Sequence, residues 1–191
     1  MRKIILASSS RWRPIILRKA GIRFSIEESG YEEDMTLKLS PEKMVKKFAL
    51  GKALAVARRH PGAVVIGADT VLICGGRVLG KPKTKKEATV MLKGWSGKTG
   101  RALTGLAIVD TQRGKRVVRV ATTKIVFRKL SPSDIARYVA TGEPMSGAGA
   151  FTIMEGGASF VRRIEGDFYN IAGLPLALLI EELKKFGVGA V

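Results

Sequence analysis

The chain has 191 residues, of which 46% are hydrophobic, and this content is enough to exclude a wholly disordered protein. It carries 34 Lys and Arg against 16 Asp and Glu, a formal net charge of +18. Its single cysteine, Cys74, excludes a disulfide framework and a cysteine-based zinc cluster, and its single histidine, His60, argues against a serine–histidine triad or a histidine-rich metal site.

The sequence contains no candidate membrane span and no candidate signal peptide. No apolar run approaches the roughly 20 residues that a membrane-spanning helix needs. The apolar stretch in the opening MRKIILASSS is shorter than the core of a signal peptide. We therefore expect a cytoplasmic protein without a membrane partner, folded as one domain over residues 1–191, with or without two lobes.

The N-terminal segment predicts a strand, a serine turn and a helix. Lys3–Ala7 is a short apolar run typical of a buried strand, Ser10 is a suitable N-cap, and Gly21 is a suitable stop. A serine turn at a helix start presents N–H groups and hydroxyls, including that of Ser8, to an anion. Arg13 in the first helical turn can bind a phosphate through its guanidinium fork. On this segment alone, an ordinary capped helix is the simpler interpretation.

An acidic loop and a long helix come next. Phe24–Ile26 predicts a second strand, and the acidic residues 32–34 lie in the loop after it. In a chain this basic, such a loop is either a solvated surface or a source of ligands for a hard cation. Ser40 followed by proline starts a helix that ends near Pro61. Lys52 lies beside the apolar stripe of this helix, so its ammonium either faces a cleft or extends to solvent.

A continuous apolar run, Ala63–Ala68, predicts a central strand with Asp69 and Thr70 at its end and with Val71–Ile73 continuing it. An aspartate there lies at the sheet edge where open α/β sheets bind ligands. Its carboxylate could hold Mg²⁺, act as a general base, or do both in turn. The alternative is a turn aspartate, although apolar residues continue after it and a carboxylate among them needs a partner.

The remaining elements alternate between strands and helices. The Gly75-Gly76 turn leads to Gly80-Lys81-Pro82, where Lys81 offers a point charge for a phosphate. The other predicted elements are a helix over 85–93, two strands over 101–110 and 115–127 joined as a hairpin, a helix from 131 to about 142, a short strand within the glycine-rich 147–157, a strand over 159–164 and a final helix over 174–187. Because hairpins interrupt the alternation, we predict an α/β fold with a mixed sheet.

The positive charge is concentrated in the middle of the chain. Residues 76–130 carry 15 basic and two acidic side chains. Such a segment attracts phosphate, which fits a nucleotide, a nucleic acid or a solvated surface. Aromatic residues make up only 6% of the chain and do not alternate with the basic runs, so the sequence lacks the stacking platform of a single-strand binder.

Taken together and in order, the segments ASSSRWR, GADTV, LGKP, GEPMSGAGAF and IEGDFYNIAGLPL resemble those of the Maf family. The resemblance runs over nearly the whole chain, from about Ile4 to Leu183. It implies a mixed, elongated sheet with flanking helices and two lobes around a central cleft, similar to the inosine triphosphate pyrophosphatases. It also implies an enzyme that hydrolyses a nucleoside triphosphate to the monophosphate and pyrophosphate with a divalent cation, Mg²⁺ or Mn²⁺.

The resemblance assigns functions to individual residues. It makes Asp69 the proton acceptor for the attacking water and places Glu33 with it near the metal. It assigns the triphosphate to five side chains: Ser8, Ser10, Arg13, Lys52 and Lys81. This set suits the chemistry, because hydrolysis of a triphosphate needs positioning and charge neutralisation more than a covalent nucleophile.

Three positions that accompany base choice in the family give conflicting indications. Trp12 matches the branch that acts on 7-methyl-GTP, whereas Thr70 matches the branch that acts on dTTP and UTP. Met154 matches neither, and Gly100 replaces the usual histidine after Ser96-Gly97. We expect a pyrimidine triphosphate or a relaxed specificity.

Two other interpretations remain open at this stage. One is a basic nucleic-acid-binding or cell-division regulatory protein without turnover, although nucleic acid is not the partner we expect. The other is a nucleotide sensor that binds a triphosphate and leaves it intact. The resemblance also suggests a homodimer, but no interface can be recognised in the sequence.

Overall fold

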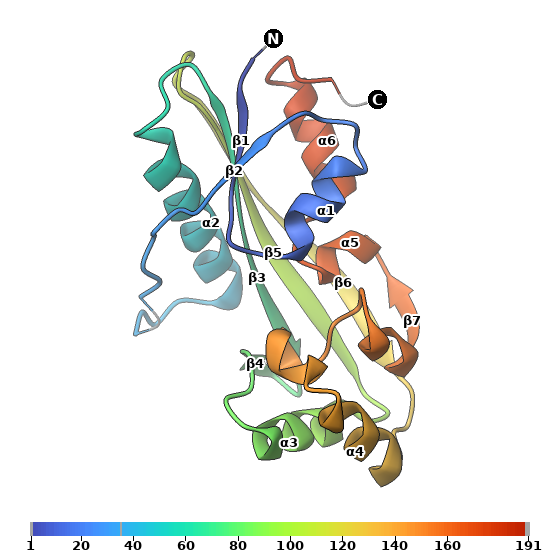
Figure 1. The fold of residues 1–191 in the computed structure, drawn as a ribbon. Helices are drawn as coiled ribbons and strands as arrows, with labels where there is room; N and C mark the ends of the chain where they lie inside the picture. Colours follow the sequence, from blue (N-terminus) through green and yellow to red (C-terminus); the bar gives the residue numbers. More distant parts are fainter. Residues whose placement is uncertain (1, 35, 190–191) are drawn as a thin grey trace. The chain divides into compact units, whose positions relative to one another are not determined.

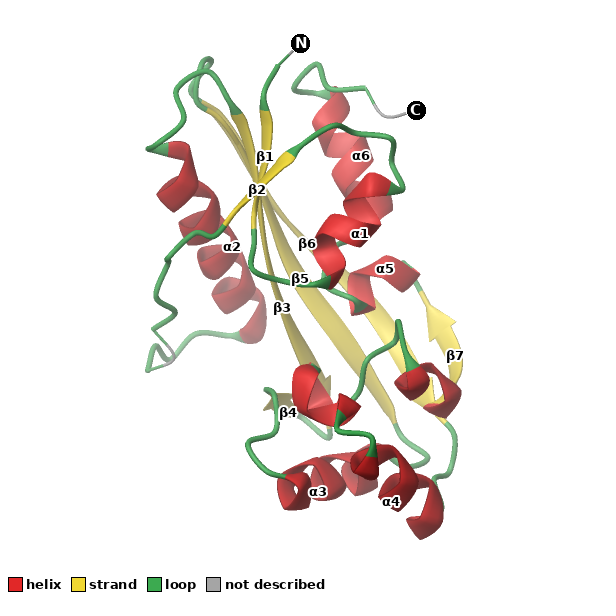
Figure 2. Cartoon of the chain, viewed as in Figure 1, coloured by secondary structure: helices red, strands yellow, loops and turns green. Residues whose placement is uncertain are grey.

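The computed structural model describes residues 2–34 and 36–189 as a mixed α/β fold built on a seven-stranded sheet (Figures 1 and 2). The strands pair in the order β2-β1-β3-β5-β6-β7, and β4 pairs with β3. The strands are β1 (Ile4–Ala7), β2 (Ser25–Glu27), β3 (Val64–Cys74), β4 (Arg77–Leu79), β5 (Thr99–Asp110), β6 (Lys115–Phe127) and β7 (Val161–Glu165). The helices are α1 (Trp12–Arg18), α2 (Pro41–Ala57), α3 (Lys85–Trp95), α4 (Pro132–Ala140), α5 (Phe168–Ile171) and α6 (Leu176–Lys184). The predicted class, a mixed sheet with flanking helices, is confirmed.

The chain divides into two compact units. The first contains Met1–Thr70, Thr104–Ala121 and Gly173–Val191, and the second contains Val71–Leu103 and Thr122–Ala172. Strands β3, β5 and β6 each contribute residues to both units. A single domain over residues 1–191 stays a prediction, and one cooperative unfolding transition would support it.

In the first unit, β1 runs parallel to both β2 and β3. Helix α2 covers one face of these strands, and α1 and α6 lie on the other (Figure 1). Helix α2 packs closely on its face of the sheet because the strands have glycines beneath it. A Cβ atom added at Gly67 of β3 would lie 2.4 Å from the Ala49 carbonyl oxygen, and one at Gly105 of β5 would lie 2.1 Å from that of Val45. Glycine is therefore required at both positions for α2 to lie directly on the sheet.

Local sequence signals explain where the helices begin. The Ser40 hydroxyl accepts a hydrogen bond from the Lys43 N–H at the start of α2, as its capping motif predicts. At α3, the Thr84 side chain caps the helix. The Glu87 carboxylate accepts from the N–H of Lys83 instead of that of Thr84, so the capping box is incomplete. Helix α4 has the complete box, between Ser131 and Asp134.

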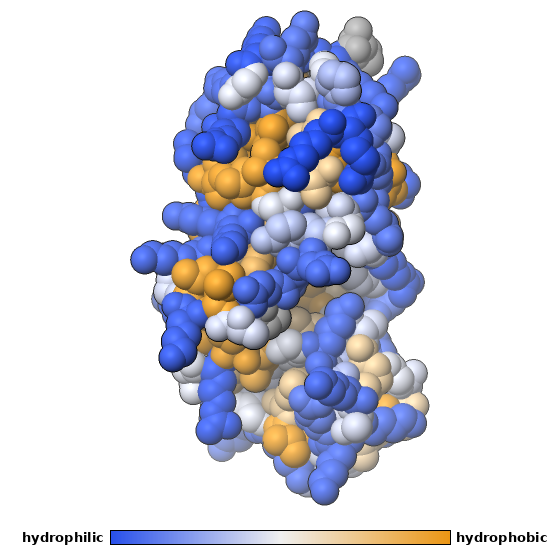
Figure 3. Space-filling view, turned by 90° about the vertical axis from the view of Figure 1, so that its left-hand side faces the viewer, coloured by the Kyte–Doolittle hydropathy of each residue, from blue (hydrophilic) through white to orange (hydrophobic). Residues whose placement is uncertain are grey.

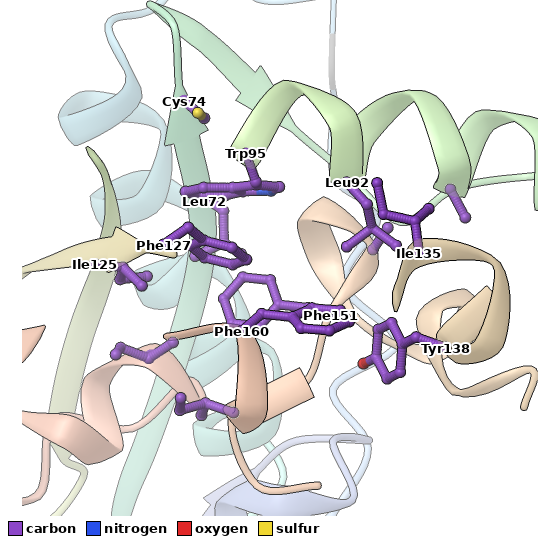
Figure 4. Close-up of a cluster of buried hydrophobic side chains, with 14 of the residues drawn as sticks. Leu72, Cys74, Leu92, Trp95, Ile125, Phe127, Ile135, Tyr138, Phe151 and Phe160 are labelled. Atoms are coloured by element: carbon purple, nitrogen blue, oxygen red, sulfur yellow. The ribbon is translucent and has the colours of Figure 1, made fainter. Parts of the chain in front are cut away.

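The second unit is organised around a buried aromatic cluster (Figure 4). The Trp95 ring stacks on Phe127 with centroids 4.6 Å apart, and both rings meet the edge of Phe151. The indole N–H donates to the Gly149 carbonyl at 3.0 Å, so the one polar atom of Trp95 is satisfied inside the cluster.

The short strand predicted within residues 147–157 is wrong. That segment lies within and between three 3₁₀ turns, Glu143–Ser146, Ala148–Ala150 and Gly156–Phe160. The backbone of Gly149 and Ala150 is left-handed, with φ of 64° and 63°, which a strand does not allow. Helix α5 is a further element that the sequence patterns did not predict.

Hydrophilic side chains cover most of the face shown in Figure 3, with apolar areas between them. Within residues 2–34 and 36–189, no helix combines the length and the apolar character needed to cross a bilayer.

Candidate active site

Two serine hydroxyls organise the turn between β1 and α1. The Ser8 hydroxyl accepts from the N–H of Ser10 at 3.1 Å, and the Ser10 hydroxyl accepts from the N–H groups of Trp12 and Arg13 at 3.3 and 3.5 Å. Ser10 thus bonds the first turn of α1 as its sequence position predicts, although the residue next to the helix is Arg11. The two hydroxyls are occupied by the turn itself, which fixes its shape.

The Arg13 guanidinium is buried and bonded on three sides. Its Nε donates to the Gly173 carbonyl at 2.8 Å, Nη1 to the Ser8 hydroxyl at 3.3 Å and Nη2 to the Thr70 hydroxyl at 3.4 Å. Burial lowers the pKa of Arg13, while the charges of Asp69 and Glu33 raise it. Arg13 therefore joins the serine turn, strand β3 and the segment before α6, with its positive charge in the field of the two acids.

A lysine and two carboxylates form the charged centre of the site. Lys52 Nζ on α2 lies 2.6 Å from Glu33 Oε1 and 2.7 Å from Asp69 Oδ1. The three residues come from the acidic loop, from a helix and from a strand. The structure thus brings together residues that the sequence could associate only through a family resemblance.

Asp69 lies in the middle of β3 and not at its end; the predicted continuation of the strand through Val71–Ile73 is confirmed. Strand β3 continues because Leu72–Cys74 pair with β4 in a hairpin whose two turn glycines both have positive φ. The pairing of β1 with β3 nevertheless stops at Ala7 and Gly67. Ser8 directly follows this last pair and Asp69 lies two residues past it, so both come after the end of the β1–β3 pairing.

Thr70 connects the site to a neighbouring strand. Its hydroxyl lies 2.9 Å from that of Thr104 on β5, which is fully buried. Sequence reasoning missed Thr104, because nothing in an apolar strand marks one threonine as part of a polar network. It also missed the Gly173 carbonyl as a partner of Arg13, although that glycine could be recognised as a point of close backbone approach.

The remaining predicted residues are placed as follows. Trp12 is half-buried at the start of α1, and the Arg11 guanidinium lies 4.5 Å from its ring centroid, so one face of the indole is covered. Lys81 and Met154 belong to the second unit. Lys81 is exposed after β4, and Met154 packs in part against the aromatic cluster.

The two acids suit a hard divalent cation. Both carboxylates approach a single point, and oxygen donors of this kind are those that Mg²⁺ and Mn²⁺ prefer. Within residues 2–34 and 36–189, no group of three or more His, Cys, Asp or Glu side chains could hold a metal. If a divalent cation binds here, Asp69 and Glu33 could each supply carboxylate oxygens, and phosphate oxygens and water would complete the coordination.

Comparison with known proteins identifies the family of the chain. Residues 3–186 match the family model described as Maf-like protein. The chain is 45% identical over 188 residues to dTTP/UTP pyrophosphatase of Moorella thermoacetica, covering 98% of this chain and 97% of that protein. It is 44% identical to dTTP/UTP pyrophosphatase of Pelotomaculum thermopropionicum, with 98% of each chain covered, and 45% identical to that of a Geobacillus species, with 98% and 100% covered. The resemblance seen in the sequence motifs is confirmed, and the chain belongs to the Maf family.

Proposed function

We propose that the protein is a nucleoside triphosphate pyrophosphatase that hydrolyses dTTP and UTP to the monophosphate and pyrophosphate. The observation that carries this proposal is the convergence of Asp69 and Glu33 on Lys52, with both acids acting electrostatically on Arg13. Several relatives of the chain are named for this activity. The reaction is the attack of water on the anhydride bond between the α- and β-phosphates, with pyrophosphate as the leaving group.

Asp69 is the group best placed to act as general base. Asp69 follows the last residue of β3 that pairs with β1 by two positions and belongs to the same unit as the serine turn. A carboxylate there can accept the proton of the attacking water and pass it to solvent. The Lys52 ammonium lies 2.7 Å from this carboxylate.

The triphosphate requires positive charge and hydrogen-bond donors. We assign this function to Lys52, to Lys81 and to the serine turn with Arg13, as the family resemblance implies. In the structure Arg13 orders the turn through Ser8, so its contribution combines charge with positioning.

Asp69 and Glu33 would hold a divalent cation, Mg²⁺ or Mn²⁺. When bound, such an ion neutralises phosphate charge and polarises the bond to be broken. The donor set of two carboxylates fits an ion that is bound together with its substrate.

The pyrimidine preference rests on the relatives and on Thr70, since Trp12 and Met154 do not agree with it. One face of Trp12 is already covered by Arg11, which leaves at most one face for a base. The thioether of Met154 is a weak acceptor and reads a base edge poorly. We expect dTTP and UTP to be preferred and other triphosphates to be cleaved more slowly.

The test is pyrophosphate release from a panel of dTTP, UTP, dCTP, ATP, GTP and 7-methyl-GTP with Mg²⁺ or Mn²⁺. Asp69→Asn should lower kcat by about 100- to 10,000-fold, the range expected for loss of a general base. Glu33→Gln should raise the metal concentration needed for half-maximal rate, whereas the neighbouring Glu32→Gln should not. Release from no triphosphate, or full activity of Asp69→Asn, would refute the proposal.

The other expectations need separate experiments. The nucleic-acid alternative is not favoured, and it would require a polynucleotide to bind at physiological salt without competition from dTTP. We propose a cytoplasmic location, where triphosphate substrates occur. A homodimer remains part of the proposal and is tested by sedimentation.

A further inference from the structure

The Lys52 ammonium occupies the point at which two acidic side chains meet. The N–O distances of 2.6 and 2.7 Å are those of strong charge-assisted hydrogen bonds. The Lys52 side chain is 14% exposed and that of Asp69 is 10% exposed, whereas Glu33 is 37% exposed. Within the described parts of the chain, Lys52 is the one side chain recorded in an ion pair with either acid.

We propose that Lys52 is a built-in competitor of the divalent cation: its ammonium holds the Asp69 and Glu33 carboxylates in the free enzyme and weakens metal binding until a triphosphate arrives. This proposal rests on the proposed function, because it concerns the same two carboxylates. It makes Lys52 a positioning residue in addition to a phosphate ligand.

Geometry and charge favour this competition. A Mg²⁺ ion binds oxygen at about 2.1 Å, so an ion shared by Glu33 Oε1 and Asp69 Oδ1 needs the space in which the ammonium now lies. The two cations also repel each other. Metal entry therefore requires Lys52 to leave at least one carboxylate.

Lys52 is the cation that can move. Arg13, a second cation that interacts electrostatically with these acids, is fixed by hydrogen bonds to Gly173, Ser8 and Thr70. Lys52 carries its charge on a flexible four-carbon stem. A triphosphate supplies new anionic oxygens, so the lysine can exchange a carboxylate for a phosphate as the metal binds.

The consequence is an order of binding. Without nucleotide, the ion pair competes with the metal, and the free enzyme binds the cation weakly. With nucleotide, the phosphates attract both cations, so the metal is bound together with the substrate to be cleaved. A merely structural ion pair predicts the opposite effect of mutation, because removal of Lys52 would then disorder Glu33 and weaken the metal site.

The test measures Mn²⁺ binding without nucleotide, by electron paramagnetic resonance of the free ion and by calorimetry. Lys52→Gln should bind Mn²⁺ with a dissociation constant on the order of tenfold lower than the wild type, since one directly contacting charge is removed. Lys52→Arg keeps the charge and should retain the weak wild-type affinity. Lys46→Gln is the matched control, since it removes an exposed charge from the same helix and should leave the affinity unchanged.

Circular dichroism and a melting curve check that each variant is folded. Mn²⁺ should raise the melting temperature of Lys52→Gln more than that of the wild type, because the two carboxylates lose their counter-ion and gain the metal. An unchanged or weaker Mn²⁺ affinity of Lys52→Gln would overturn the inference. So would an equal gain in Lys46→Gln, which would reflect net charge alone. Neither result depends on turnover, so a failure here is distinct from an absence of pyrophosphate release.

Discussion

The ring of Tyr31 lies against the backbone of Gly51 in α2, so closely that a Cβ atom at position 51 would lie 2.3 Å from the ring carbon Cε2. The same ring lies 6.2 Å from that of Phe48, centroid to centroid, on the same helix. The acidic loop is thus anchored to α2 two residues before Glu33. Because Lys52 follows Gly51 directly, this contact also sets the approach of Glu33 to Lys52.

Gly51→Ala should displace Tyr31 and with it Glu33. The overlap falls on a ring rather than a flexible chain end, so we expect a destabilisation of about 1–3 kcal/mol from overpacking. Improved helix propensity should offset about 1 kcal/mol of this. Half-maximal activity should require several times more metal, while kcat at saturating metal changes less. Urea unfolding and metal titrations of activity measure the two effects.

Two further variants separate the overlap from other causes. Gly94→Ala places a methyl group in open space on α3 and should be neutral or stabilising, with unchanged metal dependence. Adding Tyr31→Ala to Gly51→Ala removes the ring and should recover part of the lost stability, though not the position of Glu33. If Gly51→Ala needed the same metal concentration as the wild type, the contact of Tyr31 with Gly51 would not determine the position of the acidic loop and Glu33.

Most of the helices and strands could be predicted from the sequence, because helix caps, turn residues and the spacing of apolar residues are each encoded within a short segment. The serine turn, the Ser40 cap and the Gly75-Gly76 hairpin are examples, and each is present in the structure. Asp69 was also identified, within a strand that continues past it, but the sequence cannot show that β1 ends before β3 does. That boundary depends on strand pairing, which is a property of the fold.

Contacts between distant residues could not be predicted. Nothing in the sequence indicates that Gly173 receives a hydrogen bond from Arg13, 160 residues away. Gly100, which stands where the family usually has a histidine, is likewise explained by tertiary contacts, here with Trp95 and Ile73. A Cβ atom there would lie 2.3 Å from the Trp95 ring and 2.5 Å from the Ile73 carbonyl oxygen, so the packing of Trp95 excludes any side chain at this position.

A partly buried hydrogen-bond network around Glu143 should make the second unit sensitive to acid. Burial opposes ionisation of Glu143, but hydrogen bonds from Tyr138, Thr152 and the N–H groups of Gly157 and Gly156 hold its pKa below the ordinary value of 4.5. A depressed folded-state pKa stabilises the protein above pH 4.5 and loses this contribution as the pH falls through the folded-state value.

Glu143→Gln should therefore be less stable than the wild type at neutral pH, and the difference should shrink as the solution is acidified. Urea unfolding at a series of pH values measures this. Glu181→Gln, which removes an exposed carboxylate, is the matched control and should show no such convergence. A difference for Glu143→Gln that is the same at every pH would show that the lost hydrogen bonds, and not the charge, account for the effect.

Arg13→Lys tests whether Arg13 stabilises the fold through its hydrogen bonds in addition to supplying a positive charge. An ammonium keeps the positive charge but cannot reach the Gly173 carbonyl and the hydroxyls of Ser8 and Thr70 with the fixed fork of a guanidinium. Loss of these buried hydrogen bonds should cost about 1–3 kcal/mol of unfolding free energy.

The kinetic consequence should appear mainly in kcat, because the serine turn then loses the shape in which it meets the triphosphate. Arg18→Lys on the same helix keeps the charge at an exposed position and should change neither stability nor kcat. Free guanidinium ion at low concentration does not restore the three bonds together, so it should not rescue Arg13→Lys. Wild-type stability with reduced kcat would contradict the structural part of this argument and leave Arg13 as a phosphate ligand alone.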